Sequence, residues 1–308
     1  MGATVVTDQI ARLSQWARVA FATRCAARLQ PFTVLPEFVP DNTKHQKIVT
    51  EAQELAQRLA EAGGVPPEPD AATWEFAESM RASSSPFEQA MRWAKKQAAD
   101  CPADAHVYRA AASAYGAAAG YLLAASDAYV HAKREYPDPR AFESFIECAN
   151  ACGCHDDAEA ASEVDLLWLG RRLFDDEDPV PETFFGRALW PDGEPQDWRY
   201  SRKRLVELLE LPERFRSLAN MWRNDTRTTS SVTEMAMHPA YQRIVGFGRD
   251  ALPFLVRELA ESSEHWFWAL KSITGANPVT PEDRGRIDSM AEAWLLWAKE
   301  NEINGNAS

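Results

Sequence analysis

ADAHVYRAAASAYGAAAGYLLAASDAYVHAK, residues Ala103 to Lys133, is the stretch that decides the fold. Thirteen of its 31 residues are alanine, the residue with the highest helix propensity, so the stretch predicts one long helix. A large side chain recurs every seventh residue, and an alanine follows three residues after the first four of them: Tyr108, Tyr115, Leu122, Tyr129 and Tyr136, with Ala111, Ala118, Ala125 and Ala132. Such a stripe lets a neighbouring helix approach closely, so we expect the centre of a helical bundle in preference to a tyrosine-lined cofactor channel.

Two glycines lie within this predicted helix, four residues apart. Gly116 and Gly120 either extend the face on which a neighbouring helix approaches closely or mark a kink.

Helical spacing of apolar residues continues on both sides of the stretch, and the alternation typical of strands is scarce, so the chain is predicted to be all-α. Ser85, Pro86 and Glu88 have the residue types of a helix start, namely an N-cap, a first-turn proline and a capping-box acid. The expected helices are 14–29, 43–62, 85–99, 103–133, 139–151, 156–173, 201–211, 212–222, 249–260, one beginning at 265, and 281–299.

A segment rich in proline, glycine and acids divides the chain. The sequence FDDEDPVPETFFGRALWPDGEPQDW, residues 174–198, holds four prolines and two glycines and predicts a loop and a domain boundary near Trp198. We therefore expect an N-terminal helical bundle over 1–173, an acidic connector over 174–200 and a small helical module over 201–308. The helices expected at 249–260 and from 265 have the layout of one HEAT-type hairpin, with the last helix covering it.

Net charge is concentrated in the first two thirds of the chain. Of the formal charge of -13, residues 1–198 hold 31 acidic and 18 basic side chains, whereas residues 199–308 hold 15 of each. Residues 156–197 alone carry 13 acids against three arginines. Because nucleic-acid binding needs clustered Lys and Arg, we expect no direct nucleic-acid contact and favour a basic protein partner.

The cysteines and the hydropathy pattern bear on the compartment. Five cysteines with irregular spacing fit reduced thiols better than a disulfide framework. The sequence has no long apolar run of the kind that spans a membrane and no export-signal pattern. We expect a cytoplasmic protein that does not contact membranes.

Candidate chemistry is sparse. Cys148, Cys152, Cys154 and His155 lie close together in the sequence, but a zinc site usually needs a second ligand pair, so we expect buried thiols and no metal. His238 precedes a proline at a helix start and His265 stands at a helix entry; capping and positional roles are favoured over acid–base catalysis. No cofactor motif is present, so we expect no cofactor and no enzymatic activity.

The acids themselves form the candidate binding site. Glu159 and Glu163 are four residues apart on an expected helix, and four acids follow in a row: Asp175, Asp176, Glu177 and Asp178. We expect that most of the charged side chains of residues 156–165 and 175–178 are not needed for a core, so that their mutual repulsion persists until a cationic partner relieves it. A merely solvated face is the alternative.

Three segments carry a resemblance to a known family. RVAFATRCAARLQPF at 18–32, the alanine-rich tract at 108–132 and DDEDPVPETFFGRALWP at 175–191 resemble the all-helical immunity proteins of bacterial polymorphic toxin systems. This resemblance covers about two thirds of the chain. It implies a protein that neutralises a toxin by direct binding, and the acidic members of such families commonly face basic nucleases.

The C-terminal part is similar to a different group of small bacterial proteins of unknown function, through MHPAYQRIVGFGRDALPFLVREL, HWFWALKSITGANPV and MAEAWLLWAKENE. That likeness implies no activity. A helical adaptor or scaffold subunit of a phage-defence or mobile-element complex is therefore the second hypothesis, and a hydrolase using His238 or His265 is the third.

Overall fold

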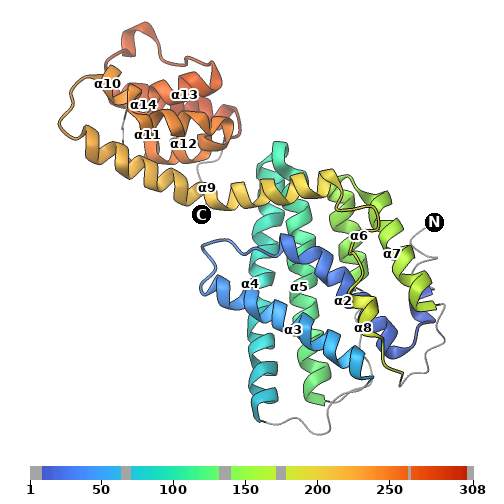
Figure 1. Ribbon diagram of the computed structural model, residues 1–308. Helices are drawn as coiled ribbons and strands as arrows, with labels where there is room; N and C mark the ends of the chain where they lie inside the picture. The colour runs from blue at the N-terminus through green and yellow to red at the C-terminus, as the bar shows by residue number, and fades with distance from the viewer. Residues whose placement is uncertain (1–8, 64–70, 132–139, 171–177, 263–264, 304–308) are drawn as a thin grey trace. The chain divides into compact units, whose positions relative to one another are not determined.

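The computed structural model describes residues 9–63, 71–131, 140–170, 178–262 and 265–303, and within these ranges its regular elements are helices without strands (Figure 1). The all-α class is thus confirmed. Apart from short 3-10 turns, the helices are α2 (Gln15–Leu29), α3 (Asn42–Ala62), α4 (Ala71–Asp100), α5 (Ala105–His131), α6 (Arg140–Cys152), α7 (His155–Gly170), α8 (Glu182–Phe185), α9 (Gln196–Thr226), α10 (Val232–Met237), α11 (Pro239–Gly246), α12 (Leu252–Glu261), α13 (Phe267–Thr274) and α14 (Ile287–Glu300). Among these described helices, none combines the length and the apolar character that crossing a membrane requires.

The chain divides into two compact units, residues 1–207 and 208–308. In the first unit, α5 is the central helix and packs along α4 and α6, with further contacts to α2 and α3. Its large–small stripe is buried from Tyr108 through Ala125, as the heptad spacing predicts. The stripe positions 129, 132 and 136 lie outside the described side chains.

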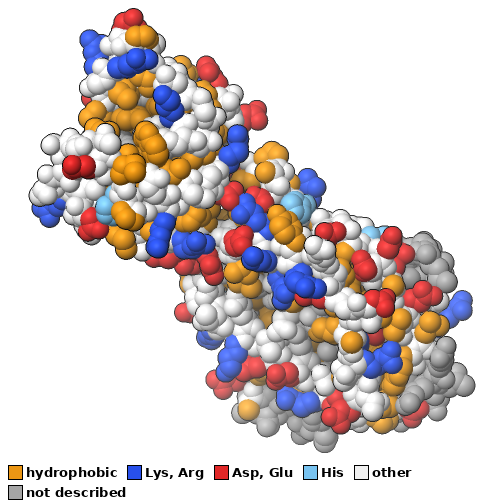
Figure 2. All heavy atoms as spheres, turned by 45° about the horizontal axis from the view of Figure 1, so that its top comes forward, with side chains coloured by type: hydrophobic (Ala, Val, Ile, Leu, Met, Phe, Trp, Pro, Cys, Tyr) orange, Lys and Arg blue, Asp and Glu red, His pale blue; other side chains and the backbone are white. Residues whose placement is uncertain are grey.

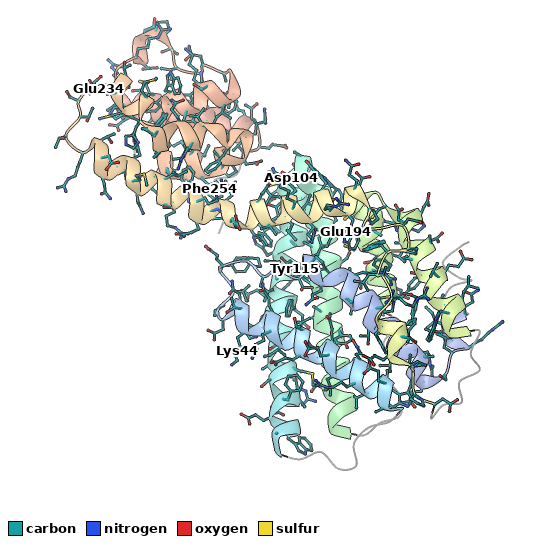
Figure 3. The ribbon with its side chains drawn as sticks, viewed as in Figure 1. Lys44, Asp104, Tyr115, Glu194, Glu234 and Phe254 are labelled. Atoms are coloured by element: carbon teal, nitrogen blue, oxygen red, sulfur yellow. The ribbon has the colours of Figure 1, made fainter. Side chains whose placement is uncertain are left out.

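Small residues on α5 allow the close approach of α4. A Cβ atom added at Gly116 would lie 3.2 Å from the Met91 sulfur of α4, so this glycine belongs to the close-approach face. The helix continues without a break through both glycines. Tyr115 lies inside the bundle and donates a 2.5 Å hydrogen bond to the Val34 carbonyl (Figure 3). Complete burial raises the pKa of the Tyr115 phenol.

The helix start predicted at Ser85 is wrong, because α4 runs without interruption from Ala71 to Asp100 with Pro86 inside it. The buried stripe of α4 extends on both sides of Pro86, because Met80 before it and Phe87 and Ala94 after it are all buried. Packing of this stripe against α5 outweighs the local start pattern, although a proline removes one backbone hydrogen bond. The helices predicted at 201–211 and 212–222 are likewise one helix, α9, with Pro212 inside it.

The Pro/Gly-rich segment is not the boundary between the units. The division falls inside α9, between Glu207 and Leu208. Trp190 and Trp198 belong to the core of the first unit, where their ring centroids lie 5.2 Å apart and both rings pack against Phe145. Aromatic side chains supply enough buried area to hold an irregular segment on a helical core, which the loop composition alone does not reveal.

The first part of α9 is held on this unit by an ion pair. Two nitrogens of the Arg204 guanidinium, Nε and Nη2, each donate a 2.9 Å hydrogen bond to the Asp104 carboxylate. Asp104 lies in the turn before α5 and is labelled in Figure 3. A two-bond guanidinium–carboxylate pair fixes orientation as well as distance.

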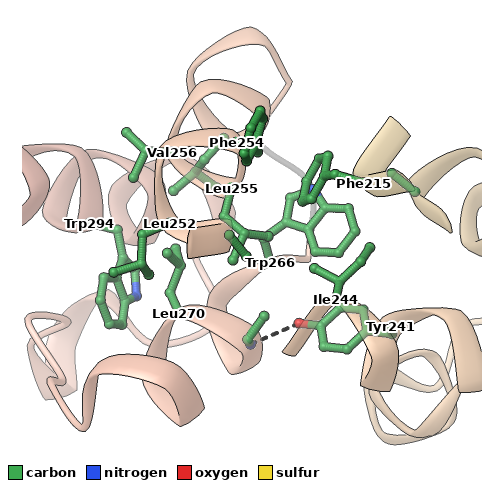
Figure 4. Packing of buried hydrophobic residues seen from close by; sticks show 14 of the residues in the cluster. Phe215, Tyr241, Ile244, Leu252, Phe254, Leu255, Val256, Trp266, Leu270 and Trp294 are labelled. Atoms are coloured by element: carbon green, nitrogen blue, oxygen red, sulfur yellow. Dashed lines mark hydrogen bonds between the residues drawn. The ribbon is translucent and has the colours of Figure 1, made fainter. Parts of the chain in front are cut away.

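The second unit is built around Trp266, which is fully buried (Figure 4). Tyr241 stacks on the indole at 5.2 Å, and Trp222 and Phe215 pack at 4.4 and 6.1 Å. The Tyr241 hydroxyl donates to the His265 carbonyl and accepts from the Ala269 amide, both at 3.0 Å. In this unit α12 packs against α14 and α13 against α11. The HEAT-type hairpin stays a prediction.

Candidate functional site

Helix α7 of the first unit has two distinct faces. Its inner face is buried and small or apolar, except for one carboxylate, Asp165. Its outer face exposes Asp156, Glu163 and Leu167, the last of these 49% exposed. Residues two positions apart point about 200° apart around a helix, so Glu163 faces solvent while Asp165 faces the core.

Two arginines of α2 surround the buried carboxylate. Asp165 Oδ2 accepts a 2.9 Å hydrogen bond from Arg24 Nε and a 2.7 Å bond from Arg28 Nη2. All three side chains are at most 3% exposed. This cluster fixes the position of α7 on α2, and therefore fixes where the outer acidic face lies.

The same arginines hold the segment that follows α8. Arg24 donates to the carbonyls of Phe184, Arg187 and Ala188, and Arg28 donates twice to the Leu189 carbonyl. The guanidinium carbons also lie over aromatic rings, Arg24 at 5.2 Å from the Phe184 centroid and Arg28 at 5.3 Å from that of Phe145. A planar guanidinium with several donors can satisfy such a set, which an ammonium group cannot.

Charge in this cluster is not balanced by carboxylates alone. Two buried guanidinium groups face one buried carboxylate, so one positive charge is stabilised by backbone carbonyls and ring faces. The cluster joins two of the segments that carry the family resemblance, residues 18–32 and 175–191.

Among the acids of residues 156–165, Asp165 belongs to the core, and the sequence reasoning did not single it out. Sequence reasoning also passed over its partners. The sequence contained a signal for these partners in the spacing i, i+3, i+4 and i+7 along one helix, which is typical of a buried stripe. The residues at these positions are Phe21, Arg24, Cys25 and Arg28.

The predicted acidic site residues are only partly placed. Glu159 is half-buried, with its Oε1 3.4 Å from Nε2 of His155 one turn earlier, and Glu163 is exposed on the same helix. Asp178 is half-buried just ahead of α8. Asp175, Asp176 and Glu177 lie outside the described residues. The structure therefore brings Glu159 and Glu163 together and leaves their relation to the acidic run a prediction.

The cysteine cluster lies on the inner side of α6 and in the turn after it. Cys148, Cys152 and Cys154 are buried, as expected of structural thiols. Burial raises the pKa of Cys148 well above its ordinary value, while a hydrogen bond from Cys148 lowers that of Cys152. Burial raises the pKa of Cys154 to about 12. Within the described residues, no group of three or more His, Cys, Asp or Glu side chains is placed to hold a metal ion.

The two histidines have different surroundings. His238 is the N-cap of α11, where its Nδ1 accepts from the Ala240 amide at 3.2 Å, and its Nε2 lies 3.2 Å from Asp225. The predicted capping role is confirmed. His265 precedes α13 and lines a surface groove of the second unit.

The structure is thus that of an all-α protein with an acidic face on α7 and a surface groove in its second unit. Comparison of the chain with models of protein families, with curated proteins and with solved structures finds no match.

Proposed function

We propose that this protein acts in the cytoplasm by binding another protein, and that it neutralises a basic toxin in the manner of an immunity protein. The family resemblance of residues 18–32, 108–132 and 175–191 supplies the idea of a toxin partner. The outer face of α7 is the proposed binding surface, and its charge and exposure are the observations that support the proposal.

This face combines charge with an apolar side chain on a fixed helix. Glu163 and Leu167 are four residues apart, so they lie on the same side of α7, and Glu159 lies one turn before Glu163. Asp165 holds the helix from its buried side. A partner can therefore meet acids for electrostatic steering and a leucine for apolar burial without a rearrangement of the helix.

The face belongs to a strongly acidic unit. Residues 1–207 hold 32 acidic and 22 basic side chains, a formal charge of -10. Such a surface attracts a basic protein and accelerates its association at low salt. Screening shortens the range of this attraction from about 10 Å at 0.1 M salt to about 3 Å at 1 M.

The experiment starts from the intact chain as bait. Proteins captured from a lysate of the source cells are identified by mass spectrometry, and each candidate is expressed alone and together with the bait. We expect a basic protein that arrests growth alone and is harmless in the presence of wild-type bait. The variant Glu159→Gln/Glu163→Gln/Leu167→Ser should restore growth arrest.

A matched variant separates the face from general damage. Lys47→Gln/Glu51→Gln removes an exposed i,i+4 ion pair of α3 in the same unit and should protect as well as wild type. Protection that survives the α7 variant would place the binding surface elsewhere. Captured proteins that do not arrest growth, such as nuclease or helicase subunits of a defence complex, would contradict neutralisation.

The second candidate is a helical adaptor that links two proteins. The apolar groove of the second unit favours it, because an adaptor needs two separate binding surfaces of different chemistry. The HEAT-like reading of residues 249–274 would fit such a role and stays part of this second proposal.

A further inference from the structure

A groove of about 570 Å³ opens on the surface of the second unit. This volume falls within the range of roughly 300–1,000 Å³ typical of ligand sites. Its lining comes from α10, α13, α14 and the loop before α14, so it is a feature of the folded unit and not of one helix.

Apolar side chains form the floor and walls. Trp294 is almost fully buried at the floor, beside Val279 and Met290. Val232, Trp268 and Ile287 stand at the walls with 53%, 42% and 39% of their surface exposed. Single exposed apolar residues are common on proteins, but three from separate elements that converge on one groove indicate a surface that is covered in use. Apolar side chains are visible on the surface of this unit beside Lys and Arg (Figure 2).

Trp294 and Val279 belong to the core of the unit, whereas Val232, Trp268 and Ile287 are exposed. The Trp268 ring borders that core, because its centroid lies 6.2 Å from that of Tyr241. Trp266, Ala269 and Leu270 take the inward positions of the α13 region, and the Trp266 ring stacks on Tyr241. Trp268 and Lys271 are three residues apart and therefore share the outer side of α13. An indole and an ammonium group thus lie next to each other at the groove.

The charged groups of the groove have one sign. Lys271 and Arg284 line it beside His265, and no carboxylate is among the described lining residues. The second unit as a whole has the opposite sign, because residues 208–308 hold 14 acidic and 11 basic side chains, a formal charge of -3. The local reversal of charge indicates a ligand that carries negative charge together with a bulky apolar group.

We propose that this groove binds a short acidic segment of a partner protein that bears one large apolar side chain. The apolar side chain lies over Trp294 between Trp268 and Ile287, and neighbouring carboxylates pair with Lys271 and Arg284. An open groove with exposed walls suits a chain segment entering from solvent, and tryptophan and arginine are the residues that most often dominate such contacts. This site is distinct in position and in charge from the acidic face of α7, and it does not depend on the toxin-binding proposal.

The test uses the full-length chain and a displayed library of random 12-residue peptides. Enriched peptides are synthesised with a fluorescent label, and their binding is measured by anisotropy. We expect an aromatic residue or leucine next to two or more acids in the enriched sequences. Trp268→Ser and Lys271→Glu/Arg284→Glu should each weaken binding by at least about tenfold, the loss typical of a hot-spot residue.

Matched controls lie on α14 outside the groove. Leu296→Ser removes a more exposed apolar side chain, and Lys299→Glu reverses an exposed charge, so both should bind the peptides as wild type does. Circular dichroism checks that every variant keeps its fold.

Several results would overturn the proposal: no enrichment, enriched peptides without acids, or groove variants that bind within twofold of wild type. A wild-type chain that dimerises in sedimentation equilibrium and becomes monomeric with Trp268→Ser would also overturn it, because a second copy would then fill the groove.

Discussion

Replacing the buried carboxylate Asp165 by asparagine is expected to destabilise the first unit strongly. Asp165→Asn keeps the shape of the side chain but removes its charge, so two buried guanidinium groups remain without a carboxylate. The lost interactions include two charge-assisted hydrogen bonds, of 2.9 and 2.7 Å. Each is worth about 1.5–3 kcal/mol, and leaving one side of a buried ion pair uncompensated costs about 3–5 kcal/mol. We take the latter as the expected loss in the free energy of unfolding.

That loss translates into a large change in melting temperature. For a unit of this size each kcal/mol shifts the midpoint by about 2–4 °C, so the first unit should melt roughly 6–20 °C lower. Thermal unfolding followed by circular dichroism at 222 nm measures it. The transition of the second unit serves as an internal reference, because the substitution lies outside it.

Glu163→Gln is the matched control. It removes the same charge two residues earlier on the same helix, but from an exposed position, and should change stability by no more than about 0.5 kcal/mol. If Asp165→Asn and Glu163→Gln melted together within about 2 °C, the buried cluster would not hold α7 on α2, and the reasoning would be refuted.

Three further predictions concern other parts of the chain. Trypsin should not cleave the bond after Arg187 in the native protein, because the arginines of α2 donate hydrogen bonds to the neighbouring carbonyls. The variant Arg28→Lys should be cleaved there. Equal cleavage of the two proteins, measured by mass spectrometry, would contradict this prediction. Burial raises the pKa of Cys25 and of Cys154 to about 12, so both side chains remain thiols at pH 8. Iodoacetamide should therefore alkylate them only when the protein unfolds. Rapid labelling of the native chain would show instead that they are accessible thiolates. Tyr241→Phe removes the hydrogen-bond partner of the half-buried His265 carbonyl and of the buried Ala269 amide. It should lower the free energy of unfolding of the second unit by about 1–3 kcal/mol in urea titration, whereas an unchanged midpoint would mean that the hydroxyl bonds add nothing.

Local composition and periodicity were sufficient to predict the helical class of the fold and the position of the central helix, α5. The alanine content of residues 103–133 fixes helix formation through propensity, and the heptad stripe fixes which side is buried, because both depend only on residues near in sequence. The capping role of His238 followed from the proline after it for the same reason.

Continuity of helices was decided by tertiary packing. Pro86 and Pro212 have the local features of helix starts, yet each lies inside a long helix whose buried stripe continues past it. The free energy of burying that stripe against other elements exceeds the cost of one lost backbone hydrogen bond, and the partner surface is not encoded near the proline.

The sequence by itself determined an all-α chain and the surplus of acids in its first part. Only the tertiary structure decided which acid serves which purpose. Asp165 and Glu163 are two residues apart and similar in chemistry, but one meets Arg24 and Arg28 from a helix some 140 residues earlier, and the other meets solvent. The groove of the second unit is also decided by tertiary structure, because Val232, Trp268 and Ile287 become neighbours only when three separate elements pack together. Periodicity within a single helix carries no information about that contact.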